Sequence, residues 1–339
     1  MPDGKSASKG AWLWRTLFIA VGLGLLWAVF SAVDAGEVWR TAVATGWGMV
    51  VVLAIYLAAF TIDSVSWLLA LTSAPFDLRW IWRTWAVRMV GETFNNIIPA
   101  ASFGGEPVKA VLLKRHYGVS YHDSTASLIL ARTINMVGLC VFLAIGFALM
   151  LDSPKLDTVY KHTAGIGLAG LATGTLLFFG IQRFRVGSAA GNWLGRRVLS
   201  EKVHWVIEQV QRMDETLVRF YSQYRGRFVG AVSLAFANWV LGAVEIYYVL
   251  WLLDAPISWA EAWVIEAVAQ MVRTGTFFIP LSLGAQEGVF LVVAGAITGQ
   301  PALGLSVGLV RRFRELLWIA WGYLLGAWYT ARQHEDRSG

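Results

Sequence analysis

Long apolar segments alternate with short polar ones along most of the chain. A helix needs about 20 apolar residues to cross the hydrocarbon core of a bilayer. The first apolar segment is too long for a signal peptide and lacks a small-residue cleavage site, so we expect it to be retained as a span. Six segments each predict a membrane-spanning helix: 12–33, 47–71, 124–151, 163–182, 228–253 and 303–330.

Two further apolar stretches, 80–117 and 260–299, are each interrupted near the middle. An interrupted helix is tolerated at membrane depth only where protein or a water-filled cavity covers its backbone. Each stretch therefore predicts a re-entrant hairpin, in which two half-helices meet at a tip. The interrupting residues are Ile98-Pro99 and Gly104-Gly105 in the first stretch, and Ile279-Pro280 and Gly284 in the second.

Basic residues in the loops predict the orientation of the spans. The N-terminus is basic, and the segment 183–227 carries nine Lys or Arg against four Asp or Glu. The loops 34–46, 152–162 and 254–266 are acidic or balanced. Both termini are therefore expected in the cytoplasm, with the first hairpin entering from the cytoplasm and the second from outside. Three more arginines also favour the cytoplasmic side for the start of the first hairpin: Arg79, Arg83 and Arg88.

The segment 183–227 carries an apolar stripe. Its apolar residues recur at alternating spacings of four and three, which places them on one face of an α-helix. An amphipathic helix on the cytoplasmic membrane surface, with Arg and Lys toward lipid phosphates, fits this pattern. The alternative is a helix that packs on the transmembrane body or on a second subunit. The stripe consists of Leu199, Val203, Val206, Val210, Met213, Leu217, Phe220 and Tyr224.

Comparison of the chain with itself indicates an internal repeat at an offset of 181 residues. Four of the eight prolines fall in pairs at this offset. Asp63 and Glu245, both acids inside predicted spans, lie within one residue of the same offset. The matched pairs include Pro75 with Pro256, Trp82 with Trp263, Thr93 with Thr274, Pro99 with Pro280, and Glu106 with Glu287.

The predicted orientation gives the repeat a direction. The unit 47–151 begins on the outer side of the membrane, and the unit 228–330 begins on the cytoplasmic side, because the extra span 163–182 lies between them. The two units are therefore expected to be inverted within a single transmembrane domain that covers residues 1–339. Inverted repeats with broken helices are typical of alternating-access transporters.

Charged residues lie within the predicted membrane segments. On insertion scales each costs roughly 2.5–3.5 kcal/mol near the bilayer centre, so it should be paired, line a polar cavity, or lie near a surface. Snorkelling is an alternative for Arg132. The arginines within 311–314 cover more than one helix face, so at least one should face the protein interior. The set is Asp63, Glu92, Arg132, Glu245, Arg273, Arg311, Arg312, Arg314 and Glu315.

The hairpin tips have residues suited to a helix start. Glu106 and Pro107 fit the first turn of a helix, and Gly104 and Gly105 offer open backbone N–H groups for an anion. Glu287 occupies the equivalent position in the second tip. Two interpretations remain open for the two glutamates: functional acids, or caps of their half-helices alone.

Composition narrows the functional classes. The chain is 57% apolar and 15% charged, with a mean hydropathy of +0.56, which excludes a disordered chain, a coiled coil and a nucleic-acid-binding domain. The single cysteine, Cys140, cannot form an intrachain disulfide or a cysteine zinc site. The five histidines show no metal-ligand spacing, and no nucleotide-binding motif is present. We therefore expect no cofactor, no metal and no nucleic-acid partner.

Several motifs together resemble the transmembrane region of lysylphosphatidylglycerol synthases and their stand-alone, flippase-like relatives. The resemblance covers about residues 12–330. The motifs are Asn95-Asn96-Ile97-Ile98-Pro99, Gly104-Gly105-Glu106-Pro107-Val108-Lys109, Ala131-Arg132-Thr133, and Pro280 with Gly284-Ala285-Gln286-Glu287-Gly288, followed by Arg311, Arg312 and Arg314.

The resemblance implies a bacterial inner-membrane protein that translocates or handles lipids, in some relatives aminoacylated phosphatidylglycerol, with hopanoid or glycolipid pathways for others. Such synthases carry a large soluble transferase domain after the membrane region. Only residues 331–339 follow the last predicted span, so we expect no lysyl transfer and no enzyme activity in this chain.

The leading interpretation is a transporter that moves a lipid with a charged headgroup between leaflets. The alternatives are a membrane-embedded enzyme acting on a lipid phosphate, and a membrane module for a separately encoded synthase. Membrane lipids, a second copy of the chain and a lipid-synthesising enzyme are the candidate partners. The predicted substrate-binding residues are Arg132, Arg273, Arg311, Arg312, Arg314, Asn95, Asn96, Gly104 and Gly105. The predicted coupling or headgroup-contact acids are Glu106, Glu287, Asp63, Glu92 and Glu245.

Overall fold

The computed structural model describes residues 43, 45–97, 104–183, 215–276, 282 and 284–338. Within these ranges the regular structure is helical throughout. Three features predicted from the sequence lie outside the described residues: the first apolar segment, the interruptions at Pro99 and Pro280, and residues 184–214 of the segment 183–227.

Five long helices coincide with predicted spans, and the last of them continues to Ser338, beyond the predicted end at residue 330. In the described part of the chain, three of them, α3, α6 and α10, are long and apolar enough to cross a membrane. The five helices are α3 (Gly48–Ala70), α6 (Tyr121–Leu151), α7 (Thr158–Arg183), α10 (Arg225–Leu252) and α14 (Pro301–Ser338).

The two interrupted stretches each form a pair of helical legs. The first helix pair consists of α4 (Leu78–Ile97) and α5 (Glu106–Tyr117). The second helix pair consists of α11 (Trp259–Gly275) and a leg made of α12 (Ala285–Val289), the π-helical turn η2 (Phe290–Ala294) and α13 (Gly295–Thr298). The start of α5 at Glu106 confirms the helix start predicted there.

The two pairs begin and end with equivalent local structure. Asp77 accepts a hydrogen bond from the backbone N–H of Trp80 at 2.7 Å, and Ser258 forms a capping box with Glu261 at the start of α11. The second legs end at Gly118 and Gly299, with φ of 72° and 75°, a conformation that favours glycine. The two caps, like the two glycines, are 181 residues apart, which is the offset of the sequence repeat.

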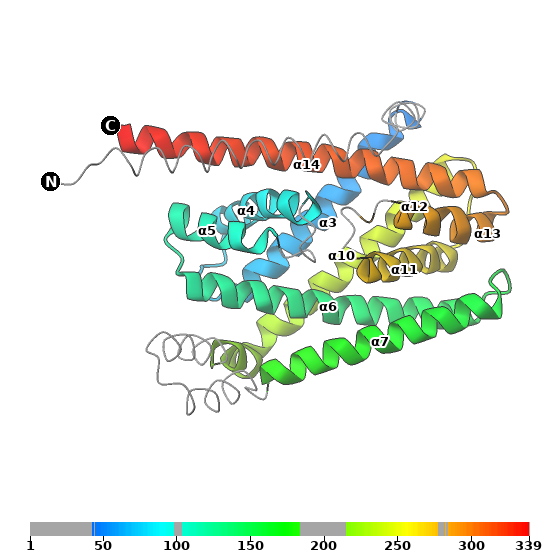
Figure 1. Cartoon of the computed structure of the whole chain (residues 1–339), viewed down its shortest axis with the longest axis horizontal. Coiled ribbons are helices and arrows are strands. Elements are labelled where there is room, and N and C mark those ends of the chain that lie inside the picture. Colours follow the sequence, from blue (N-terminus) through cyan, green and yellow to red (C-terminus); the bar gives the residue numbers. More distant parts are fainter. Residues whose placement is uncertain are drawn as a thin grey trace.

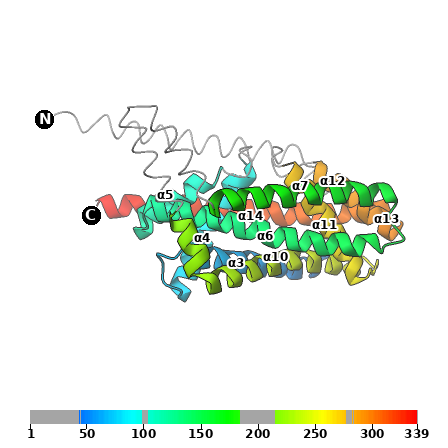
Figure 2. The same ribbon diagram turned by 90° about the horizontal axis from the view of Figure 1, so that it is seen from below.

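The helix pairs lie toward opposite ends of the molecule, between α14 and α6 (Figure 1). The last helix of each half packs on the helix pair of the other half: α14 packs on α4, and α6 packs on α11. Helices α3 and α10 pack along each other and form one face of the molecule (Figure 2).

The legs of the first helix pair approach closely at two glycines. A Cβ atom at Gly105 would clash with the backbone carbonyl of Gly91, and one at Gly91 would clash with the side chain of Lys109. Glycine therefore allows α5 to begin directly against α4, and this contact holds Lys109 beside the end of α4.

The described end of the predicted amphipathic segment packs on the helical body. Leu217 and Phe220 are 2% and 1% exposed and lie in one apolar cluster with Leu130 of α6 and Ala231 and Ala235 of α10. For residues 215–223, the structure therefore favours the alternative of packing on the body over a helix held only by lipid.

Candidate functional site

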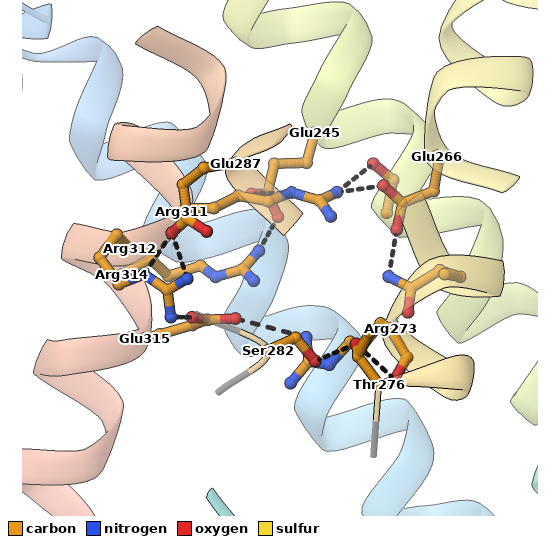
Figure 3. Close-up of polar contacts among 12 residues, drawn as sticks. Glu245, Glu266, Arg273, Thr276, Ser282, Glu287, Arg311, Arg312, Arg314 and Glu315 are labelled. Carbon is orange, nitrogen blue, oxygen red and sulfur yellow. Dashed lines mark hydrogen bonds and ion pairs between the residues drawn. The ribbon is translucent and has the colours of Figure 1, made fainter. Parts of the chain in front are cut away.

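Eight charged side chains from four helices converge beside the second helix pair (Figure 3). We call this group the second cluster. It includes three arginines and one glutamate of α14, two residues of α11, and one each of α10 and α12. Its members are Glu245, Glu266, Arg273, Glu287, Arg311, Arg312, Arg314 and Glu315.

Arg311 connects α14 to both α10 and α11. Its guanidinium pairs with Glu266 and lies 3.4 Å from Glu245, and it also donates to the carbonyl of Gly242 at 3.2 Å. Glu266 accepts a second hydrogen bond, from Gln270 at 2.7 Å. Arg311 therefore holds three helices together through side chains that are almost completely buried.

The other two arginines of α14 are engaged as fully. Arg312 pairs with Glu287 and, at 2.8 Å, with Glu315. Arg314 pairs with Glu245, and its guanidinium carbon lies 3.8 Å from the ring centroid of Tyr56. The three arginines are 2–4% exposed. This confirms that at least one faces the protein interior, and in fact all three do.

This arrangement changes the role expected of these arginines. Among the described residues, the second cluster contains four carboxylates and four guanidinium groups, so each buried charge has an opposite charge nearby. Breaking such buried pairs is strongly destabilising because it leaves a charge uncompensated. Arg311, Arg312 and Arg314 thus serve first to hold the helices together. Arg273 differs, because it is 34% exposed and its ion pair with Glu315 is longer, at 3.3 Å.

A smaller group, which we call the first cluster, lies between α3 and the first helix pair. Arg88 pairs with Asp63 and lies 3.8 Å from Glu92. Lys109 lies 2.8 Å from Glu92 and 3.1 Å from Glu106. Three carboxylates therefore share two cations in this cluster, whose members are Asp63, Arg88, Glu92, Glu106 and Lys109.

The sequence prediction missed both cations of the first cluster as site residues. Arg88, named above for the orientation of the spans, lies inside α4 and binds an acid of α3. The spacings were a usable signal, because residues three or four apart share a helix face: Arg88 precedes Glu92 by four, and Lys109 follows Glu106 by three.

Asn95 fixes the start of α5. Its carboxamide oxygen accepts a hydrogen bond from the Gly105 N–H at 2.7 Å, and its amide nitrogen lies 3.5 Å from Glu106. The Gly105 N–H is therefore occupied rather than open for an anion as predicted, because the asparagine closes onto it. Gly104 precedes this turn, and Asn96 lies in α4 with a side chain outside the described set. Arg132 is partly buried and lies in α6, a different helix from the one that carries Arg311, Arg312 and Arg314.

A cavity of about 60 Å³ lies between the two clusters. Glu92 and Arg273, which have opposite charge and lie at the 181-residue offset of the repeat, both line it. Tyr56, Thr93 and Trp318 also line the cavity and were not predicted from the sequence. Aromatic residues in an apolar segment carry no periodic signal that separates a cavity wall from ordinary core.

The two tip glutamates have different surroundings, so the same substitution should affect them differently. Glu287 accepts the Gly284 N–H at 2.9 Å and neutralises Arg312 in a cluster of balanced charge, whereas Glu106, equally exposed, is one of three carboxylates that share two cations. We expect Glu287→Gln to lower the free energy of unfolding by about 1.5–3 kcal/mol, because a buried guanidinium loses a charged partner. Glu106→Gln should cost less than about 1 kcal/mol.

Denaturant unfolding of both purified variants in the same detergent measures this difference. Glu215→Gln, at an exposed position of the segment 215–223, is the matched control. Equal losses for the two tip variants would contradict the assignment of different roles.

Metal binding has no support in the described part of the chain, where no three His, Cys, Asp or Glu side chains group as metal ligands.

Comparison with protein families gives a match over residues 15–322 to the model described as the lysylphosphatidylglycerol synthase transmembrane region. No curated protein and no solved structure matches the chain. The family match and the apolar helices together show a multi-pass membrane protein.

Proposed function

Because the chain belongs to the family of the lysylphosphatidylglycerol synthase transmembrane region, we propose that it moves a lipid with a charged headgroup between the leaflets of the bacterial inner membrane. The observation that carries this proposal is the cavity between the two helix pairs, lined by Glu92 from one and Arg273 from the other. A polar space shared by two halves of a membrane protein is typical of a transport site. Transport, rather than catalysis, is the activity proposed for this chain.

The proposed architecture is an inverted repeat of six spans and two re-entrant hairpins, with both termini in the cytoplasm. The packing supports it, because exchanging the two halves exchanges the contact of α14 with α4 for that of α6 with α11. The helix α3 packs on its own equivalent, α10, as expected for elements beside a pseudo-two-fold axis. The common offset of the caps and terminal glycines supports the same relation.

Within the cavity, Arg273 is the proposed contact for a headgroup phosphate. It is the most exposed arginine of the second cluster, and a guanidinium has five N–H donors, of which one ion pair uses few. Glu92, 30% exposed, is the proposed contact for a headgroup amine or a coupling cation. Arg311, Arg312 and Arg314 support the site from behind by fixing the helices that present Arg273 and Glu315.

Reconstitution into liposomes tests this function. Labelled anionic, zwitterionic and aminoacylated phospholipids are placed in one leaflet, and their appearance in the other is followed over time. We expect at least one of these headgroups to move faster than in protein-free liposomes. A change in lipid mass, measured on the same samples by mass spectrometry, would instead indicate an enzyme. Co-purification of a soluble transferase without lipid movement would indicate a membrane module of a separate synthase.

A further inference from the structure

We propose that two contacts at opposite ends of the molecule act as latches, each of which closes one side of the central cavity. The inference rests on the proposed transport function and names the groups that regulate access to its site. The inner latch joins Tyr117 of α5 to Tyr329 of α14, and the outer latch joins Lys155, after α6, to Glu261 and Ile297 of the second helix pair.

The inner latch is built from aromatic groups. The hydroxyl oxygens of Tyr117 and Tyr329 are 2.5 Å apart. The ring of His116 lies 4.8 Å from that of Tyr329, and the guanidinium of Arg83 lies 4.9 Å from the ring of Tyr117. This group ties the open end of the first helix pair to the last helix of the other half, on the side predicted to be cytoplasmic.

The outer latch is built on one ammonium group. Lys155 lies 2.6 Å from the carboxylate of Glu261, at the start of α11, and donates to the carbonyl of Ile297 at 3.1 Å, near the end of α13. Lys155 thereby holds both legs of the second helix pair at their open end. The residue follows α6, so this contact also joins one half of the molecule to the other.

The two latches occupy equivalent places in the repeat. The inner latch involves the end of α5 at Tyr117, and the outer latch involves the residue next to Thr298, which lies 181 positions further along. Trp80, whose ring centroid is 5.9 Å from that of Tyr117, lies at the same offset from Glu261. At both ends, the contact joins the open end of one helix pair to the other half of the molecule. The side chains that make it differ, so the two ends share the position of the contact and not its chemistry.

The distance between the latches suits gates on the two sides of a membrane. Tyr329 follows Pro301 by 28 residues of α14, and Pro301 lies beside the end of α13 at Ile297. A helix of that length measures about 42 Å, close to the thickness of a bilayer with its headgroups, about 40–45 Å. The cavity lies between these ends, against Trp318 and Ile319 of the same helix.

Opening one latch would uncover the cavity from one side only. The cavity is walled by α4 and α14, which pack directly on each other, and the inner latch adds a contact between α5 and α14 at their cytoplasmic end. Release of Tyr117 from Tyr329 therefore removes one of the contacts that oppose separation of these walls toward the cytoplasm, so the separated state becomes more populated. Release of Lys155 removes one contact that opposes separation of α11 from the end of α6 toward the outside, while the packing of the two helices and the inner contact stay in place.

Side-specific labelling of the cavity tests this assignment. In a chain with Cys140→Ser, the substitution Thr93→Cys places one thiol in the cavity wall. Its reaction with a small membrane-impermeant methanethiosulfonate reagent is then timed from each side of oriented proteoliposomes. Tyr329→Phe should raise the rate from the cytoplasmic side about fivefold, the factor that corresponds to one lost hydrogen bond. Lys155→Met should raise the rate from the outer side about two- to fivefold, because the Lys155 side chain is 47% exposed.

Matched controls and second variants make the result decisive. Tyr323→Phe removes a hydroxyl from the same helix, and Lys161→Met removes an ammonium group near the outer end that bonds only Leu151 among its described contacts. Neither should change labelling. If Tyr329→Phe or Lys155→Met folds poorly, the variant at its partner residue replaces it. Tyr117→Phe is expected to have the effect of Tyr329→Phe, and Glu261→Gln that of Lys155→Met. Salt at about 1 M should weaken the ionic outer latch and leave the inner one unchanged.

Labelling that rises equally from both sides, or that matches the controls in all four latch variants, would overturn the proposal. The readout is accessibility and not lipid movement. If the latches respond as expected but no lipid moves, the gates stand and the proposed substrate is wrong. If lipid moves and labelling does not respond, transport stands and access is controlled elsewhere.

Discussion

Arg311→Met should lower the free energy of unfolding by about 3–5 kcal/mol, the range for removing one partner from a buried ion pair. The substitution keeps an unbranched apolar stem but removes the guanidinium, so that among the described residues Glu266 keeps Gln270 and Glu245 keeps Arg314 as side-chain partners. Both carboxylates are 1–2% exposed and cannot turn to water. Denaturant unfolding in detergent, or the fraction of protein that elutes as a folded species, measures the loss.

A double variant separates the ion pair from the bulk of the side chain. Arg311→Met combined with Glu266→Gln removes the charge that the single variant leaves uncompensated, so its loss should be smaller than the sum of the two single losses. Arg225→Met, at the exposed first position of α10, is the control for the substitution itself and should change stability little. Strict additivity would show that the two residues are not coupled.

Arg273→Gln should have the opposite profile, with lipid movement reduced at least about tenfold and stability reduced by less than about 1 kcal/mol. The side chain is 34% exposed and makes one ion pair at 3.3 Å, so little of the fold depends on it. A lost charge-assisted hydrogen bond to a phosphate is worth about 1.5–3 kcal/mol, which corresponds to a tenfold or larger change in rate. The liposome assay and unfolding, measured on one preparation, give both values.

Conservative substitution refines this test. Arg273→Lys keeps the charge but not the planar fork of donors, so it should recover part of the activity. Arg79→Gln, on the exposed first turn of α4, is the matched control and should transport normally. Wild-type transport by Arg273→Gln would remove the phosphate contact from the proposal while leaving the cavity itself unexplained.

The helices could be predicted from the sequence because a membrane-spanning helix requires a long, continuous apolar segment. The predicted segments 47–71 and 124–151 correspond to α3 and α6 within a few residues. The 181-residue offset, found from prolines, also relates the caps Asp77 and Ser258, which differ in type and were invisible to a search for identical residues. Local signals of this kind require no knowledge of which helices touch.

The partners of the charged residues were much harder to predict. Periodicity places Arg311, Arg312 and Arg314 on different faces of one helix, but not opposite particular acids of α10, α11 and α12. The pairing is a property of tertiary packing, and the sequence separation between Arg314 and Glu245 is 69 residues. We therefore predicted phosphate binding from the positive charge of these arginines alone. In the structure, carboxylates of neighbouring helices already neutralise that charge. The pairing of Arg88 with Asp63 was missed for the same reason.

The charge balance of the two clusters has a consequence for a membrane that holds an electrical potential. An elementary charge that crosses the full potential exchanges about 2.3 kcal/mol per 100 mV. The second cluster joins four carboxylates to four guanidinium groups, so its movement as a unit transfers no net charge. The first cluster, with three carboxylates and two cations, carries one uncompensated negative charge. Voltage would therefore act on a movement of the first cluster as a unit, including Asp63 of α3, and not on such a movement of the second cluster, so the two related halves would do unequal electrical work.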